Sequence, residues 1–204
     1  MIDPLLLSKG ALIGFSIAAP VGPIGLLCIR RSLCDGWRAG LATGLGAATA
    51  DSVYGCVAGL GLTVVSGFLI EHRATLAILG GAFLCWLGLR ALRTPAAEQT
   101  APAAETGIGG AFFTTFLLTL TNPMTILAFV AVFSGLGLAG QLEGSGALIV
   151  GVFLGSAAWW LLLSSGVAVL RTRIGPAWMR VVNCGSGLLL CAFGVYSVIT
   201  GLRG

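Results

Sequence analysis

Long apolar stretches separated by short clusters of charged residues run through this sequence of 204 residues. The stretch GALIVGVFLGSAAWWLLLSSGVAVL, for example, contains no charged side chain. A helix needs about 20 mainly apolar residues to cross the roughly 30 Å hydrocarbon core of a membrane. The strands of a membrane β-barrel alternate apolar and polar residues, and these stretches do not alternate. Because only 9% of the residues are charged, against about 25% in soluble domains, the sequence predicts an all-α integral membrane protein.

The apolar stretches predict six transmembrane helices. Their approximate ranges are 5–29, 39–70, 75–92, 109–138, 147–170 and 181–201. The first stretch is not expected to be a cleaved signal peptide, because Lys9 interrupts it and no basic region precedes it. We therefore count it as the first membrane-spanning helix.

Basic residues are concentrated in alternate connections between these predicted helices. The connections on one side carry Arg30, Arg31, Arg38, Arg90, Arg93, Arg171, Arg173 and Arg180. The other side carries Lys9, Arg73 and Arg203. By the positive-inside rule the arginine-rich connections face the cytoplasm, so both termini are expected on the outer face of the membrane. The formal net charge of +4 follows from this topology, and we do not interpret it as a sign of nucleic-acid binding.

The two halves of the sequence resemble each other. A shift of 100 positions aligns Gly22 and Pro23 with Asn122 and Pro123. In the third and sixth predicted helices, a shift of 106 positions aligns Gly81, Cys85 and Gly88 with Gly187, Cys191 and Gly194. Two units with an odd number of crossings enter the membrane in opposite senses, an arrangement that many secondary transporters share. We predict two inverted three-helix repeats, residues 1–92 and 109–204, joined by a polar cytoplasmic linker, 93–108.

The first predicted helix of each unit contains proline at a matching position. The two motifs are PVGP, with Pro20, Gly22 and Pro23, and TNPM, with Asn122 and Pro123. Proline lacks a backbone N–H and clashes with the carbonyl four residues earlier, so both helices are expected to break there. In lipid the freed carbonyls are tolerated only where they face protein or water. The paired breaks therefore predict a substrate site between the repeats, with a purely structural kink as the alternative.

Asp51 is the one acidic residue well inside a predicted span. A charge at the centre of a membrane helix costs roughly 3 kcal/mol, so such residues usually face a cavity. Tyr54, three positions later, lies on the same side of the helix and can donate a phenolic hydrogen bond. Two roles are open for Asp51: a carboxylate that couples transport to the proton gradient, or a counter-charge for a substrate amine. A structural ion pair with an arginine is the alternative.

Several classes of function lack the residues that they need. The sole lysine is Lys9, so the sequence has no phosphate-binding loop for ATP. The sole histidine, His72, lies outside the predicted spans, so no hydrolase triad can be assembled. The six cysteines contain no C-x-x-C motif, and no acid cluster indicates a metal site. We expect no enzymatic activity, no cofactor and no bound metal.

Two segments of the sequence resemble a known family. SIAAPVGPIGLLCIRRSLCDGWRAGLATGLGAATADSVYG and FLLTLTNPMTILAFVAVFSGLG are similar to motifs of the LysE/RhtB family of amino-acid exporters, and the resemblance extends over nearly the whole chain. It implies a secondary exporter of amino acids or related small solutes in the bacterial inner membrane. The termini, expected on the outer face from the arginine distribution, would then lie in the periplasm. The motif positions carried over are Pro20, Gly22, Pro23, Asp51, Asn122 and Pro123. Many members read Pro-Gly-Pro where this chain reads Pro-Val-Gly-Pro.

Three functions compete at this point. Proton-coupled export of an amino acid fits the paired breaks and Asp51, which would bind substrate together with Tyr54. A divalent metal or cation exporter should place several oxygen or thiolate ligands in the membrane, and the spans offer one Asp and scattered cysteines. A thiol electron carrier should have a cysteine in the first and fourth spans, and only the first has one, Cys28. The expected partners are a small-molecule substrate and the lipid bilayer, and a homo-oligomer remains open.

Overall fold

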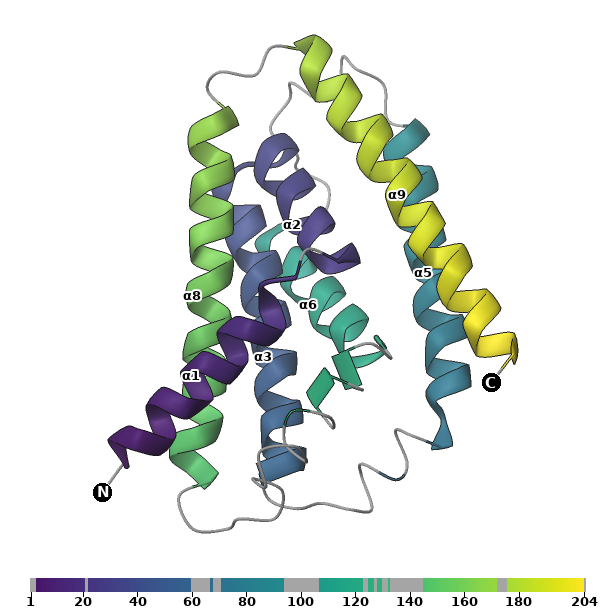
Figure 1. Cartoon of the computed structure of the whole chain (residues 1–204). Coiled ribbons are helices and arrows are strands. Elements are labelled where there is room, and N and C mark those ends of the chain that lie inside the picture. Colours follow the sequence, from purple (N-terminus) through teal and green to yellow (C-terminus); the bar gives the residue numbers. More distant parts are fainter. Residues whose placement is uncertain are drawn as a thin grey trace.

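The computed structural model describes residues 3–20, 22–59, 67, 71–93, 107–122, 125–126, 128–129, 132, 145–171 and 176–203. Seven helices are present in this part of the chain (Figure 1), and it contains no strand. Their bounds are α1 Pro4–Ala18, α2 Pro23–Cys34, α3 Trp37–Gly59, α5 Arg73–Arg93, α6 Gly107–Leu120, α8 Ser145–Arg171 and α9 Pro176–Arg203. The predicted all-α class is confirmed.

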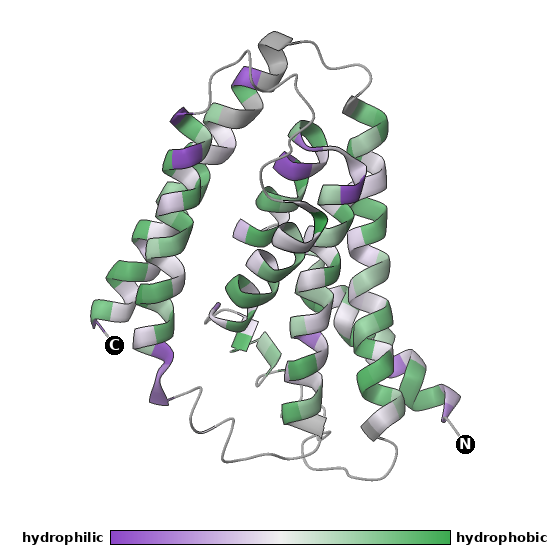
Figure 2. Cartoon of the chain, turned by 180° about the vertical axis from the view of Figure 1, so that it is seen from behind, coloured by the Kyte–Doolittle hydropathy of each residue, from purple (hydrophilic) through white to green (hydrophobic). Residues whose placement is uncertain are grey.

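Three helical segments in the described ranges are long and apolar enough to cross a membrane: Arg73–Arg93, Gly146–Leu170 and Cys184–Arg203. The bent pair α1 and α2 makes a fourth if both helices count as one span. Large apolar side chains on these helices face outward, as expected for contact with lipid; Leu162 and Leu188 are each 62% exposed. In Figure 2 the hydrophilic residues are concentrated toward the ends of the helices. The chain is thus a multi-pass membrane protein, and the number six remains a prediction.

The helix α3 lies at the centre of the bundle, in contact with α1, α2, α6 and α8 (Figure 1). It is 23 residues long but does not reach the hydropathy of a membrane span, because its sequence is rich in glycine, alanine and threonine and includes Asp51. A helix enclosed by other helices needs little apolar surface toward lipid. Small side chains instead let the neighbouring backbones approach closely.

The first predicted break is present between α1 and α2. The two helix axes differ by 81°. Neither Pro20 nor Pro23 has an N–H, so the carbonyls of Ser16 and Ala19 cannot form the usual bond to the residue four positions later. Pro23 instead occupies the first position of α2, where a missing N–H has no cost. The second predicted break follows α6, which ends at Leu120, but residues 123–124 lie outside the described part of the chain.

Glycines bring two pairs of helices into backbone contact. At the crossing of α1 and α8, Gly14 lies against the backbone of Val152, and Gly155 lies against the backbone of Ala11. At the crossing of α5 and α9, a Cβ added to Gly81 would lie 2.6 Å from the carbonyl oxygen of Gly194. No larger side chain fits at these positions without moving a helix.

The crossing of α5 and α9 joins residues that the sequence comparison had aligned. Gly81 contacts Gly194, and Gly88 contacts Gly187, so the two helices run antiparallel. Between these contacts, the Sγ atom of Cys85 lies 3.7 Å from the carbonyl oxygen of Cys191, and the Sγ atom of Cys191 lies 3.7 Å from the carbonyl oxygen of Cys85. Each of the two cysteines therefore contacts its counterpart in the other half in the same way.

Arg31 departs from the sequence prediction. It was assigned to a cytoplasmic connection, but α2 continues to Cys34 and the Arg31 side chain is only 4% exposed. Its Nη1 atom donates hydrogen bonds to Thr43 Oγ1 at 3.0 Å, to the carbonyl oxygen of Ala111 at 3.0 Å and to Thr115 Oγ1 at 3.1 Å. The side chain thus joins α2 to α3 and α6. A loop was wrongly predicted here because a charged pair ended the apolar run.

We expect Arg31→Lys to destabilise the protein even though it keeps the charge, because an ammonium cannot reproduce the bonds of a guanidinium in this geometry. Losing one or two hydrogen bonds to a charged group should lower the free energy of unfolding by about 1–3 kcal/mol. For a chain of this size each kcal/mol corresponds to about 2–4 °C in melting temperature, which thermal unfolding in detergent measures. Arg38→Lys, at an exposed position on α3, is the control. Equal melting temperatures for both variants would show that the hydrogen bonds of Arg31 do not hold α2 to α3 and α6.

Candidate functional site

A cavity of about 70 Å³ lies where α1 gives way to α2. A single water molecule needs roughly 10–15 Å³ by the same measure, so the cavity has room for about five to seven waters. Residues of α1, α2, α3 and α8 form its wall, together with the end of α6 and the residues after it. The lining residues are Ile17, Ala18, Pro20, Gly22, Pro23, Ile24, Gly25, Ala47, Asp51, Thr119, Asn122, Thr125 and Trp160.

Most of the predicted site residues line this one cavity. Pro20, Gly22 and Pro23 come from the break between α1 and α2, Asp51 comes from α3, and Asn122 follows α6. Two predicted residues do not belong to this set. Tyr54 is buried beside the end of α6 and is not part of the lining, and Pro123 lies outside the described residues.

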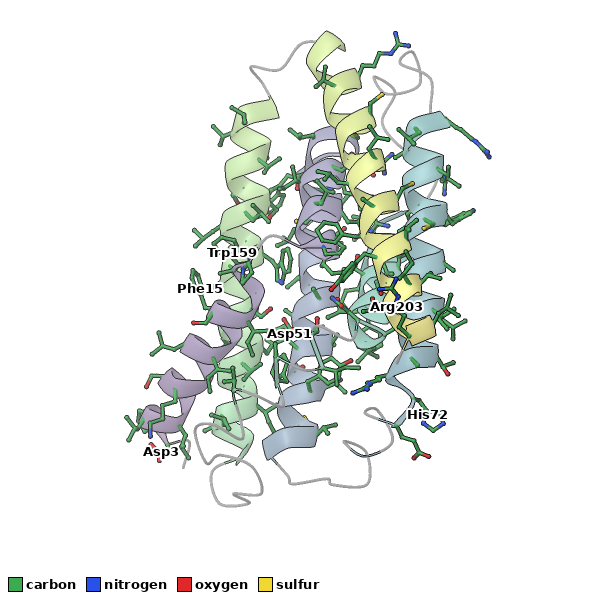
Figure 3. All side chains as sticks on the ribbon, turned by 45° about the vertical axis from the view of Figure 1, so that its right-hand side comes forward. Asp3, Phe15, Asp51, His72, Trp159 and Arg203 are labelled. Carbon is green, nitrogen blue, oxygen red and sulfur yellow. The ribbon has the colours of Figure 1, made fainter. Side chains whose placement is uncertain are left out.

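Asp51 is buried in the interior of the bundle, with 3% of its surface exposed. Figure 3 shows it well inside, whereas Asp3 and His72 lie toward the edges of the molecule. Its Oδ2 atom accepts a hydrogen bond of 2.6 Å from Ser156 Oγ on α8. Among the described residues no arginine, lysine or histidine forms an ion pair with Asp51. A buried carboxylate without a counter-charge is costly unless a proton or a bound cation neutralises it.

Ser156 links Asp51 to an aromatic side chain on the cavity wall. The Trp160 Nε1 atom, one turn further along α8, donates a hydrogen bond of 3.1 Å to Ser156 Oγ. Ser156 therefore accepts from Trp160 and donates to Asp51, which fixes the direction of its O–H bond. Nothing in the sequence singles out Ser156, whose partner lies 105 positions away in the chain.

Tyr54 satisfies carbonyls at the end of α6. Its hydroxyl donates a hydrogen bond of 2.6 Å to the carbonyl oxygen of Leu120 and a weaker one of 3.4 Å to that of Thr119. The helical partner of the Thr119 carbonyl would be the N–H of residue 123, which is proline and has none. The phenol thus stabilises a broken helix end and does not point its donor at the cavity. Pro123 is the sequence signal for the acceptors of Tyr54, which lie four and three residues before this proline.

Metal ligation finds little support in the described part of the chain. No group of three histidine, cysteine, aspartate or glutamate side chains lies close enough together there to hold a metal ion. The six cysteines are free thiols. The cavity instead combines one carboxylate with hydroxyl, amide, indole and backbone groups, a mixture that suits a small polar organic solute.

The sequence pattern of the family described as LysE type translocator matches residues 15–201. The chain belongs to this family. This LysE type translocator is a membrane transporter and not an enzyme, and the family resemblance drawn from the two proline motifs is confirmed.

Bacterial relatives extend over most of the translocator. A protein of Pseudomonas aeruginosa named chemotactic transduction protein ChpE is 30% identical over 88% of this chain and 90% of its own length. A putative amino acid efflux protein of Bacillus subtilis, YcgF, is 24% identical over 94% of each chain. A threonine efflux protein of Salmonella typhi is 29% identical over 76% of this chain and 79% of its own. No solved structure shows a significant match.

We expect Tyr54→Phe to lower the free energy of unfolding by about 1 kcal/mol, because the carbonyls at the end of α6 lose their hydroxyl donor. The measurement is the melting temperature of the purified protein. Tyr196→Phe is the matched control, since Tyr196 on α9 is 63% exposed and its phenol has no comparable buried role. Indistinguishable shifts in the two variants would show that the Tyr54 hydroxyl does not stabilise the helix end.

Proposed function

We propose that this translocator exports small amino acids across the bacterial inner membrane in exchange for protons, and that the cavity at Asp51 is the substrate site. The observation that carries the proposal is a buried carboxylate without an ion-pair partner in the described structure, on the wall of a small cavity at a helix break. An amino acid supplies the ammonium that such a carboxylate lacks. The names of the relatives from Bacillus subtilis and Salmonella typhi point to the same class of substrate.

The directions of the helix pairs support six spans in two inverted repeats. Along α1 and α8 the contacts advance together, from Gly10 with Leu148 to Gly14 with Val152, so these helices run parallel. The pair α3 and α6 is also parallel, because Gly46 contacts Phe112 and Tyr54 contacts Leu120. A two-fold rotation about an axis in the membrane plane would exchange residues 1–92 with residues 109–204. This rotation would place α1 on α6 and α8 on α3, so the first pair of helices would map onto the second.

The remaining contacts fit the same exchange. The pairs α5 with α9 and α3 with α8 are antiparallel and map onto themselves, with Cys85 and Cys191 close to the axis. On this proposal α1 with α2 is the first span and α6 begins the fourth. The linker between the halves corresponds to predicted residues 93–108, and the flanking helices end at Arg93 and begin at Gly107.

The orientation follows from the distribution of arginine. The helix ends that flank three connections, α2 to α3, α5 to α6 and α8 to α9, carry seven arginines, and Arg173 lies within the last connection. We assign this side of the bundle to the cytoplasm. Both termini lie toward the opposite end of the bundle in Figure 1, which we assign to the periplasm.

Exchange of a proton for a substrate follows from competition for Asp51. The buried carboxylate is neutralised either by a proton or by a substrate ammonium, and one carboxylate does not hold both. A proton arriving from the periplasm therefore displaces the amino acid there, and an amino acid arriving from the cytoplasm displaces the proton. Movement of one group of helices against another at the break would alternate the access of the cavity to the two sides.

The experiment is efflux from proteoliposomes loaded with a panel of amino acids or divalent cations, in a medium more acidic than the lumen. We expect small amino acids such as L-threonine to leave faster when the pH gradient is imposed. Export of divalent cations without amino acids would overturn the proposal in favour of a cation exporter.

Asp51→Asn should lose at least nine-tenths of gradient-driven efflux, because an amide binds neither the proton nor the ammonium as a carboxylate does. The melting temperature should stay close to that of the wild type, since the amide oxygen still accepts the bond from Ser156. Asp3→Asn is the matched control, because Asp3 is an exposed helix cap and asparagine caps helices equally well. Undiminished gradient-driven efflux in Asp51→Asn would remove the coupling role of Asp51.

A further inference from the structure

We propose that the first turn of α2 and the hydroxyl of Thr119 form a subsite for the carboxylate of the substrate, separate from Asp51. The inference rests on the proposed function and adds to it a requirement for a free carboxylate. It thereby assigns recognition roles to backbone groups and to a side chain that the sequence did not select.

The N-terminus of α2 borders the cavity with N–H groups that have no acceptor within the helix. Its cap residue is Gly22, which has no side chain to accept a hydrogen bond, whereas α1 is capped by the carboxylate of Asp3. The first helical bond is donated by the N–H of Leu26, so the N–H groups of Ile24 and Gly25 have no acceptor within the helix. Both residues line the cavity. The positive end of the helix dipole adds to the attraction for an anion.

Thr119 provides an independent sign of a missing ligand. It is 3% exposed and lines the same cavity, yet its Oγ1 atom has no hydrogen-bond partner among the residues that the structure describes. Three other threonines of α6 and its end bond back to the carbonyl four residues earlier: Thr114 to Gly110, Thr115 to Ala111 and Thr121 to Leu117. A buried hydroxyl that makes no such bond is costly, and a ligand oxygen in the cavity would satisfy it.

The cavity thus has two poles. Asp51 is the negative pole, and the start of α2 with Thr119 is a set of donors for a negative group. A zwitterionic amino acid matches both poles at once, whereas an amine or an amino-acid amide matches only the first. The N–H groups of α2 and the Thr119 hydroxyl of α6 would then bind the two oxygens of one carboxylate. The transporter would thus recognise the carboxylate that all amino acids share and not the side chain of the substrate.

The first test needs only the wild-type protein in loaded proteoliposomes. L-Threonine amide keeps the ammonium and the size of L-threonine but has no carboxylate. We expect the amide to compete for L-threonine efflux at least tenfold more weakly than L-threonine itself. Equal competition by the amide, with L-threonine efflux intact, would overturn the carboxylate subsite and leave the proposed function standing. Absence of efflux for every amino acid would overturn the proposed function itself.

The second test removes the hydroxyl. Thr119→Val keeps the shape of the side chain, and we expect it to raise the half-saturating concentration of L-threonine by about tenfold, the usual effect of losing a hydrogen bond to a charged group. Thr119→Ser restores a hydroxyl and should bring this concentration back to within about twofold. Thr121→Ala is the matched control, because the Thr121 hydroxyl bonds to Leu117 and Leu118 carbonyls and Thr121 is not part of the lining. Equal half-saturating concentrations for Thr119→Val and Thr121→Ala would overturn the role of Thr119.

A third variant tests the helix end. Apart from its two chain neighbours, an added methyl group at Gly22 would meet no described atom within 4 Å, and its backbone has φ of −101°, so Gly22→Ala introduces no clash with the described residues packed around it. The methyl group would occupy space beside the first N–H groups of α2. In the Gly22→Ala variant we expect L-threonine to compete more weakly for the carrier, while competition by L-threonine amide changes little. An equal weakening of competition by both solutes would count against the subsite.

Discussion

Every backbone N–H and carbonyl of a membrane protein must find a partner without help from lipid. This requirement decides where the chain can be broken. Between α1 and α2 the interruption opens onto a cavity with polar groups in its wall, and at the end of α6 the hydroxyl of Tyr54 donates to the carbonyls of Thr119 and Leu120. The same constraint explains why Arg31, deep between α2, α3 and α6, uses one nitrogen to serve three acceptors. At these two described interruptions the protein itself thus replaces water.

Much of the architecture could be predicted from residue types. The PVGP motif located the first break, because proline acts on the backbone through its own chemistry. Gly81, Gly88, Gly187 and Gly194 were aligned before any contact was known, and they form the α5 and α9 crossing. Asp51 stood out because a lone acid in an apolar stretch is rare. In each case the signal lay within a few neighbouring positions.

Other features depend on partners distant in the chain. Arg31 was placed in a loop because counting basic residues treats every arginine beside an apolar stretch as exposed, and its acceptor Ala111 lies 80 positions away. The phenol of Tyr54 was expected to reach the substrate, but its acceptors are 65 and 66 positions away. Ser156 carried no local signal at all. Such contacts exist only after the helices have packed, so no pattern of neighbouring residues reveals them.

The position of Arg31 also limits how the molecule can change shape. A guanidinium pulled away from its oxygen partners would remain charged in apolar surroundings, so α2, α3 and α6 are constrained to travel as one rigid body. The glycine contacts hold α1 to α8 in a second body. The break between α1 and α2 lies between the two bodies, and the bond between Ser156 and Asp51 spans the surface along which they would slide.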